Sequence, residues 1–270
     1  MAKVHAQRSP IFVLQMGRVG STSVVSAISQ AYQEIDCPVA VHHNHYIANY
    51  QKVQERARQD LEDYSLALGD IERVDRGVRE TLLAQVEKNH PVKIISLVRD
   101  PVARNVSTFF FAFSQFVPDW KEKETQGLLS ASALNVIFEG KRHFIQTAFH
   151  WFDEQIKDGL GLDVYAVPFD AARGWQVYKQ GPVELLVLRM EDLYRTGEAI
   201  LRQFLHLPAF KMVKVNTGEE RESYELYRRF LTHPISQEYL EMTYATKLAR
   251  HFYTEAEIAQ SIHRWRNPKG

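Results

Sequence analysis

Short apolar runs alternate with longer helical patterns along the first hundred residues. One run begins at residue 11, and others occupy 39–41 and 92–98. Each predicts a buried strand, because a strand covered on both faces carries apolar side chains on both sides. Helical periodicity follows the first run over 24–32 and recurs within 46–90. This alternation favours an α/β fold with a central parallel sheet flanked by helices.

The second half of the chain predicts more strands and then a helical end. Residues 162–170, 174–181 and 183–190 are typical of strands, and the glycine-proline turn before the last predicts a hairpin. The polar stretch 116–142 fits either a mobile lid or a surface excursion. The final third has helical periodicity throughout. We expect one α/β domain over 1–270 with a helical C-terminal part.

A glycine-bounded turn joins the first strand to the following helix. Residues 17–23 read Gly-Arg-Val-Gly-Ser-Thr-Ser. Glycines let backbone N–H groups approach an anion, hydroxyls donate hydrogen bonds, and the helix N-terminus adds a favourable dipole. An ordinary NTPase loop has four residues between its glycines and a lysine before the Ser/Thr, whereas only Arg18 and Val19 separate Gly17 from Gly20. A plain strand-to-helix connection is the alternative interpretation.

A second candidate anion site follows the apolar run 92–98. Asp100 and Pro101 have the residue types of an N-cap and a first helical position, so a helix begins there. Arg99 precedes this helix and Ser107 lies within it. Both could converge on a phosphate at the carboxyl end of the strand, where parallel sheets bind ligands. A capped helix with solvated arginines is the alternative.

Together the two motifs resemble those of sulfotransferases of the carbohydrate or capsular-polysaccharide type. The loop GRVGSTS resembles their 5′-phosphosulfate-binding loop, and LVRDPVARNVS resembles their 3′-phosphate-binding motif. The resemblance implies a three-layer P-loop-like fold. It also implies 3′-phosphoadenosine 5′-phosphosulfate (PAPS) as donor, the 3′,5′-diphosphate PAP as product, and no metal. By this resemblance the 5′-phosphosulfate is held by Arg18, Val19, Gly20, Ser21, Thr22 and Ser23, and the 3′-phosphate by Arg99 and Ser107.

Histidines cluster directly after the predicted strand 39–41. Because strand side chains alternate, His43 and His45 should share a face while His42 points the other way. Histidine exchanges a proton near neutral pH. A metal site and a polar strand end without function are alternative interpretations. The sulfotransferase resemblance implies a catalytic base here, with His45 as base, His43 as a supporting donor and Arg18 compensating charge on the leaving phosphate.

The composition limits the kinds of binding partner and cellular location that we expect for the protein. The chain has 270 residues, with 33 basic and 33 acidic side chains, so its formal net charge is zero. A nucleic-acid-binding protein held by a global positive field is therefore not expected. The single cysteine excludes an intrachain disulfide. No apolar run has membrane-spanning length and the N-terminus lacks a signal-peptide core, so we expect no membrane span and a cytoplasmic location.

These features lead to one expected activity and two alternatives. We expect a sulfotransferase that moves a sulfuryl group from PAPS to an acceptor hydroxyl, carried by a carbohydrate, a lipid or a small molecule. A P-loop nucleotide kinase or NTPase would share the fold, but should carry a loop lysine and a carboxylate for Mg²⁺. A non-catalytic PAP-binding protein would keep the phosphate motifs without a working base.

Overall fold

The structure is a computed structural model that describes residues 9–60, 62–142, 147–213, 215 and 220–268. The chain divides into two compact units. The first, here the strand unit, comprises Met1–Tyr50, Asp70–Arg99 and Trp151–Asn216. The second, here the helical unit, comprises Gln51–Gly69, Asp100–His150 and Thr217–Gly270. We describe each by itself, and the expectation of one domain over 1–270 stays a prediction.

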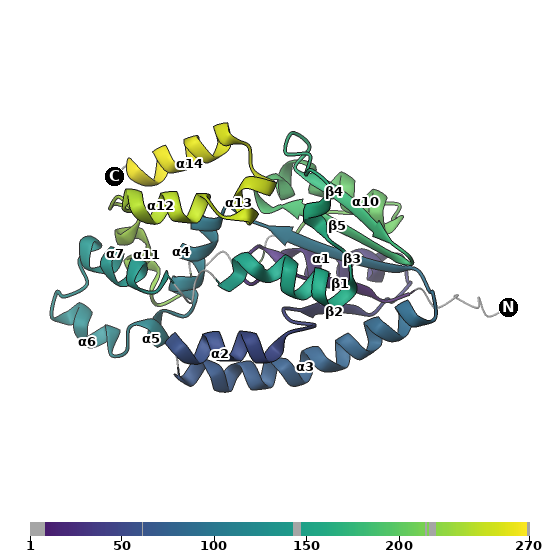
Figure 1. Ribbon diagram of the computed structural model, residues 1–270, viewed down its shortest axis with the longest axis horizontal. Coiled ribbons are helices and arrows are strands. Elements are labelled where there is room, and N and C mark those ends of the chain that lie inside the picture. The colour runs from purple at the N-terminus through teal and green to yellow at the C-terminus, as the bar shows by residue number, and fades with distance from the viewer. Residues whose placement is uncertain (1–8, 61, 143–146, 214, 216–219, 269–270) are drawn as a thin grey trace. The chain divides into compact units, whose positions relative to one another are not determined.

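The strand unit is built on a five-stranded sheet in the order β2-β1-β3-β5-β4 (Figure 1). Neighbouring strands run parallel except β4, which pairs antiparallel with β5. The predicted α/β class is confirmed, and the sheet that was expected to be parallel is parallel in every pairing except that of β4 with β5. The strands are β1 (Ile11–Leu14), β2 (Val41–Asn44), β3 (Val92–Val98), β4 (Trp175–Gln180) and β5 (Val183–Arg189).

Hydrophobic burial explains the central strands. Every residue of β1 is buried, and β3 and β5 are each buried except at their second residue. Those two exceptions are Lys93 and Glu184, which face each other across the ladder and form an ion pair of 2.9 Å. The predicted hairpin between β4 and β5 is confirmed, and Gly181 turns it with a φ of 53°.

Two predicted strands differ from the structure. The run 162–170 forms no strand; it contains the 3-10 helix η3 (Val164–Ala166). There Asp163 accepts a hydrogen bond from the backbone N–H of Tyr165 at 2.9 Å, so a local side-chain bond replaces a ladder bond. The strand expected at 39–41 begins at Val41 instead and continues through the histidines.

Helices complete the strand unit. Helix α1 buries Val24, Ala27, Ile28 and Ala31, whose spacing places them on one face, and packs against β2. Helix α3 begins in the helical unit and ends in the strand unit. The helical elements other than η3 are α1 (Ser21–Glu34), α3 (Glu62–Glu87), the π-helix η2 (Phe152–Lys157), α9 (Asp158–Leu160), η4 (Met190–Asp192), the π-helix η5 (Leu193–Gly197) and α10 (Glu198–Leu205).

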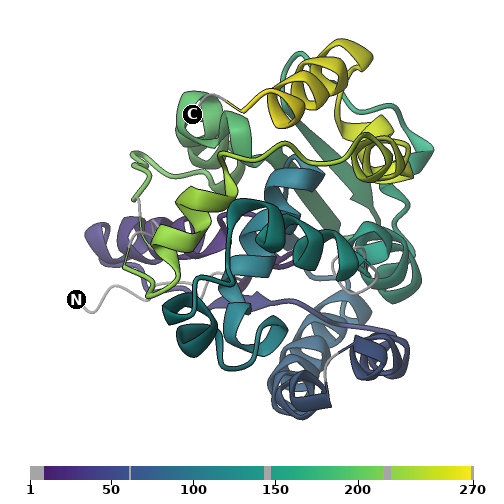
Figure 2. The ribbon, with the colours of Figure 1, turned by 90° about the vertical axis from the view of Figure 1, so that its left-hand side faces the viewer.

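The helical unit packs around aromatic side chains. Phe109 lies within 5.6 Å, ring centre to ring centre, of Phe110, Phe113 and Phe138. Its helices, including the C-terminal ones predicted from periodicity (Figure 2), are α2 (Tyr50–Asp60), α4 (Pro101–Phe111), α5 (Phe113–Phe116), α6 (Trp120–Thr125), α7 (Ala131–Gly140), η1 (Thr147–His150), α11 (Tyr224–Phe230), α12 (Gln237–Tyr244), α13 (Lys247–Phe252) and α14 (Glu255–Arg266).

The stretch 116–142 is tied into this unit by α6 and α7. Helix α7 buries Leu134 and Phe138. Glu124, near the end of α6, accepts two hydrogen bonds from Arg229, at 2.7 and 2.8 Å. These contacts favour a surface excursion anchored to the helical unit. No helix in the described part of the chain is both long and apolar enough to cross a membrane.

Candidate functional site

The candidate site lies where the chain changes direction across the sheet. From β1 the chain passes through α1 to β2 on one side of β1, and it later crosses to β3 on the other side. The carboxyl ends of β1 and β3 therefore flank a topological switch point, the usual ligand position in open α/β sheets. The two predicted anion-binding motifs follow these two strands.

The loop after β1 has the backbone form of an anion cradle. Arg18 and Gly20 both adopt the left-handed conformation, with φ of 71° and 85°. Alternating backbone conformations of this kind turn successive N–H groups toward one point. Because residue 20 is glycine, no N-cap side chain occupies the first-turn N–H groups of α1, which have no intrahelical acceptor. The loop can therefore bind an anion through its backbone.

The loop side chains divide into buried and accessible ones. Val19 is completely buried, so only its backbone can contribute to a ligand. Ser21 and Ser23 are also buried, whereas Thr22 is exposed. The hydroxyl of Ser23 accepts a hydrogen bond from the backbone N–H of Val215 at 3.3 Å, so the chain after α10 reaches the start of α1.

Arg99 brings the second motif to the first. Its Nη1 donates a hydrogen bond to the backbone carbonyl of Arg18 at 3.2 Å. The structure therefore places the guanidinium at the end of β3 beside the loop after β1, as the two-motif hypothesis requires. The predicted N-cap is confirmed, since Asp100 accepts from the N–H of Ala103 at 2.8 Å. Ser107 lies on α4 in the helical unit, and its predicted role stays a prediction.

The histidines occupy the positions that strand alternation predicts. The rings of His43 and His45 lie side by side, with centroids 5.4 Å apart. His42 points the other way and stacks on Phe12, 5.2 Å between centroids. His43 belongs to β2 and His45 is the first residue beyond it. Parallel pairing of β2 with β1 brings both rings to the loop after β1.

Gln15 and Ser21 connect the histidine pair to the loop. Nε2 of His43 lies 2.9 Å from the Gln15 amide nitrogen and 2.9 Å from the Ser21 hydroxyl. Nδ1 of His45 lies 3.1 Å from the backbone carbonyl of Gln15. Burial and the neighbouring charge of His45 lower the pKa of His43 from 6.5 to about 4. His43 is therefore neutral at pH 7 and accepts hydrogen bonds at Nε2.

The two histidines differ in the hydrogen-bond partners of their ring nitrogens. Nδ1 of His45 lies 3.1 Å from the Gln15 carbonyl, which only accepts, and 3.2 Å from the Gln15 amide nitrogen, which only donates. The shorter contact, to the carbonyl, favours a proton on Nδ1 in the neutral ring. The lone pair of His45 is then on Nε2, the nitrogen suited to a general base. In His43 the lone pair already faces two donors. Of the two rings, His45 is chemically the better base.

A buried carboxylate and an indole fix the backbone around His45. Asp75 of α3 accepts from the side chain of Asn44 and, at 2.8 Å, from the backbone N–H of Tyr46. Burial raises the pKa of Asp75 despite these bonds. On the other side, Trp151 donates its indole N–H to the backbone carbonyl of His45 at 2.6 Å. These hydrogen bonds fix the backbone on both sides of His45.

Residues of the π-helix η2 fix the backbone of the segment that follows His45. Gln155 is completely buried, and its carbonyl oxygen accepts from the backbone N–H groups of Ile47 and Ala48, both at 2.8 Å. Asn49 donates to the backbone carbonyl of Glu154 at 2.8 Å. π-Helical turns occur often at functional sites. Here the turn caps the segment that follows the candidate base.

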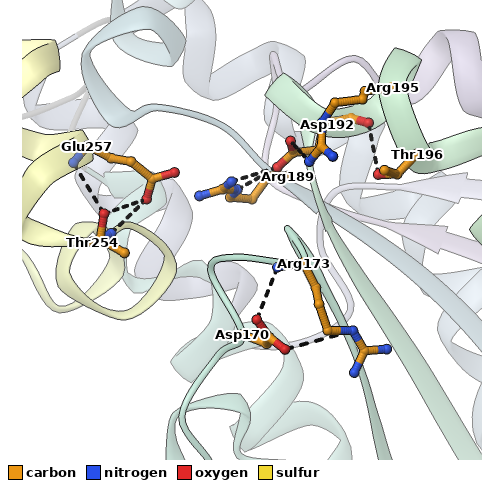
Figure 3. A network of polar contacts seen from close by, with 8 residues as sticks. All are labelled: Asp170, Arg173, Arg189, Asp192, Arg195, Thr196, Thr254 and Glu257. Carbon is orange, nitrogen blue, oxygen red and sulfur yellow. Dashed lines mark hydrogen bonds and ion pairs between the residues drawn. The ribbon is translucent and has the colours of Figure 1, made fainter.

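A separate ionic network lies at the end of β5 (Figure 3). Asp192 pairs with buried Arg189 at 2.7 Å and with Arg195 at 2.6 Å. Gly174 packs so closely that a Cβ there would lie 2.1 Å from a carboxylate oxygen of Asp192. Asp192 therefore serves as a structural counter-ion. No group of three or more His, Cys, Asp or Glu side chains in the described residues could hold a metal ion.

Reasoning from sequence missed Gln15, Asp75, Trp151 and Gln155, which all contact the chain around the two histidines. Gln15 did carry a signal, since it is the first polar residue after a buried strand at the ligand-binding edge. Asp75 and Trp151 carried none, because they lie 30 and more residues from His45 and reach it only in the fold.

Comparison with known proteins gives one match. Residues 130–254 match the model of the NKWYS family, described as "Putative capsular polysaccharide synthesis protein". The match supports a role related to polysaccharide, and it lies outside the cradle and the histidines. No curated protein and no solved structure matches the chain.

Proposed function

We propose that the protein is a PAPS-dependent sulfotransferase of P-loop-like fold that acts on a hydroxyl group of a polysaccharide or its precursor. The proposal rests on one observation: the loop after β1, Arg99 and the histidine pair lie together at one topological switch point. The loop after β1 contacts Arg99 through the Arg18 carbonyl and contacts His43 through Ser21. An anion held by the loop would thus lie beside a histidine pair. The polysaccharide component of the proposal rests on the family match.

Charge stabilisation is the first task of the loop in this proposal. The backbone N–H groups from Arg18 to Ser23 would hold the 5′-phosphosulfate. The guanidinium of Arg18 would compensate charge that builds on the departing phosphate. Arg99 would hold the 3′-phosphate. Backbone and guanidinium donors are fixed before the reaction, so they need no reorganisation as charge develops.

Proton transfer is the task of His45. Its Nε2 takes the proton of the acceptor hydroxyl as the acceptor oxygen attacks sulfur. A new O–S bond forms, the bond between sulfur and the bridging phosphate oxygen breaks, and PAP leaves with that electron pair. The acceptor becomes a sulfate ester and His45 becomes an imidazolium that later releases its proton to water. A base of this kind typically accelerates a reaction about 10²–10⁴-fold.

The alternatives predict different chemistry. A nucleotide kinase or NTPase needs a loop lysine, and Ser21 follows Gly20 where that lysine would stand. A non-catalytic PAP-binding protein would bind PAP without transferring a sulfuryl group to an acceptor.

Binding and transfer together test the proposal. By calorimetry in EDTA, we expect PAP to bind more tightly than 5′-AMP. Mass spectrometry of capsular polysaccharide fractions incubated with PAPS should show added sulfate. His45→Ala should keep PAP binding and lose about 10²–10⁴-fold in rate, whereas His90→Ala at an exposed position should change neither. Equal affinity for PAP and 5′-AMP would contradict the two-phosphate hypothesis.

A further inference from the structure

We propose that Gln15 is the positioning residue that makes His45, and not His43, the base of this site. The inference rests on the proposed function, because it assigns roles within the same histidine pair. Gln15 follows β1 directly and is completely buried. The Gln15 amide nitrogen finds an acceptor in His43 Nε2, whereas its side-chain oxygen is buried without a hydrogen-bond partner among the described residues.

The Gln15 side chain occupies the lone pair of His43. Its amide nitrogen lies 2.9 Å from His43 Nε2, and an amide N–H can only donate. A donor directed at a ring nitrogen stabilises the neutral imidazole and opposes its protonation. His43 is thereby kept from competing for the acceptor proton.

The Gln15 backbone orients His45. Two groups of Gln15 lie near His45 Nδ1: the carbonyl at 3.1 Å and the amide nitrogen at 3.2 Å. The carbonyl only accepts and the amide nitrogen only donates, and the shorter contact, to the carbonyl, favours the proton on Nδ1. Gln15 therefore gives opposite hydrogen-bond roles to the ring nitrogens that face it: Nε2 is the acceptor in His43 and Nδ1 the donor in His45. In both neutral rings the proton is then on Nδ1.

The same arrangement lets the cradle respond to a ligand. The lone pair of His43 faces both the Gln15 amide and the Ser21 hydroxyl, each at 2.9 Å. One lone pair needs one donor. Ser21 can therefore turn its hydroxyl toward a sulfuryl group while Gln15 keeps His43 hydrogen-bonded. Donor binding can therefore redirect Ser21 without leaving the His43 lone pair unbonded.

His43 faces His45, and His45 faces Asp75 of α3 in addition. The neutral Gln15 amide nitrogen lies within 3.2 Å of a ring nitrogen of each histidine. A charge placed at position 15 should therefore change the titration of both histidines.

Histidine NMR tests the assignment without an activity assay. In the wild-type protein, ¹⁵N shifts should show His45 protonated on Nδ1 and His43 unprotonated on Nε2. Gln15→Glu places a carboxylate beside both rings, and the pKa of His43 should rise by about 1–3 pH units. Gln15→Leu removes one of the two donors at His43 Nε2 and leaves the Ser21 hydroxyl, so that pKa should rise less than in Gln15→Glu. The matched control is Gln180→Glu, at an exposed position on β4, which should leave both histidines unchanged.

Two results would overturn the assignment: a proton on Nε2 of His45 in the wild type, or an unchanged His43 titration in Gln15→Glu. Should Gln15→Leu fail to fold, the wild-type tautomers and the glutamate variant still decide.

Kinetics adds a second measurement. With PAPS and an acceptor, Gln15→Glu should move the acidic limb of the pH–rate profile to higher pH, with PAP affinity unchanged, because the carboxylate stabilises the His45 imidazolium. An acidic limb that stays in place would overturn the role of Gln15 in catalysis. If NMR gives the expected tautomers and no sulfuryl transfer is found, the assignment stands and the proposed function fails.

Discussion

The stability of the protein should fall in mild acid because of His43. Burial and the charge of His45 lower the pKa of His43 to about 4 in the folded state, from 6.5 as the ordinary value. The unfolded chain therefore binds a proton in a range where the folded protein does not. By linkage, the stabilising contribution of neutral His43 to the free energy of unfolding is fully present above about pH 6.5. It is lost progressively as the pH falls toward 4, because the unfolded chain then binds a proton that the folded protein does not.

The size of the effect follows from the same pKa. Each pH unit of pKa difference corresponds to about 1.4 kcal/mol, so the unfolding free energy should drop by about 1–2 kcal/mol between pH 8 and pH 5. Other groups titrate in this range as well. The substitution His43→Gln isolates the contribution, because an amide can accept from Ser21 and Gln15 without titrating.

Urea denaturation at several pH values provides the assay. The wild-type protein should lose about 1–2 kcal/mol more than His43→Gln between pH 8 and pH 5. His90→Gln, at an exposed position, serves as the control and should follow the wild type. Parallel stability curves for the wild type and His43→Gln would refute the argument that His43 is held neutral by the fold.

Three further predictions concern single contacts. Arg18→Ala should weaken PAP binding by about 1.5–3 kcal/mol in calorimetry, since a charge-assisted contact is lost, and unchanged affinity would exclude Arg18 from the donor site. Asp75→Ala leaves two donors near the candidate base without their acceptor, and should lower the unfolding free energy by about 2–4 kcal/mol in urea. Gly174→Ala must relieve a 2.1 Å approach to Asp192 at a φ of 75°, so its melting temperature should fall by several degrees; an unchanged value would contradict the packing.

The strands that are buried on both faces of the sheet were predictable from the sequence. Runs such as 92–98 and 183–190 are apolar on both sides and were placed within one residue. Strand β2 has a different pattern, because it lies at the edge of the sheet and carries polar side chains toward the site. Its start was therefore placed two residues early. The run 162–170 has strand-like composition, but a local Asp163 bond decides its structure.

The candidate site was predictable only in its strand-end residues. Arg18, Arg99, His43 and His45 lie at or within a few residues of the carboxyl ends of strands, so topology alone brings them to one edge. The order of the strands, which decides that β1 lies between β2 and β3, is not written in any local pattern. Contacts from Asp75 and Trp151 depend on that order and on helix packing, so no spacing in the sequence revealed them.

The left-handed backbone of Arg18 has an evolutionary consequence. A non-glycine residue at a φ of 71° costs about 1–3 kcal/mol relative to glycine, which adopts this conformation without strain. A library of all substitutions at position 18 should therefore give opposite rankings under two selections. Selection for abundance in the cell should enrich glycine, and selection for the activity of the site should enrich arginine. The arginine at position 18 would then be a residue that improves function while it lowers the thermostability of the protein.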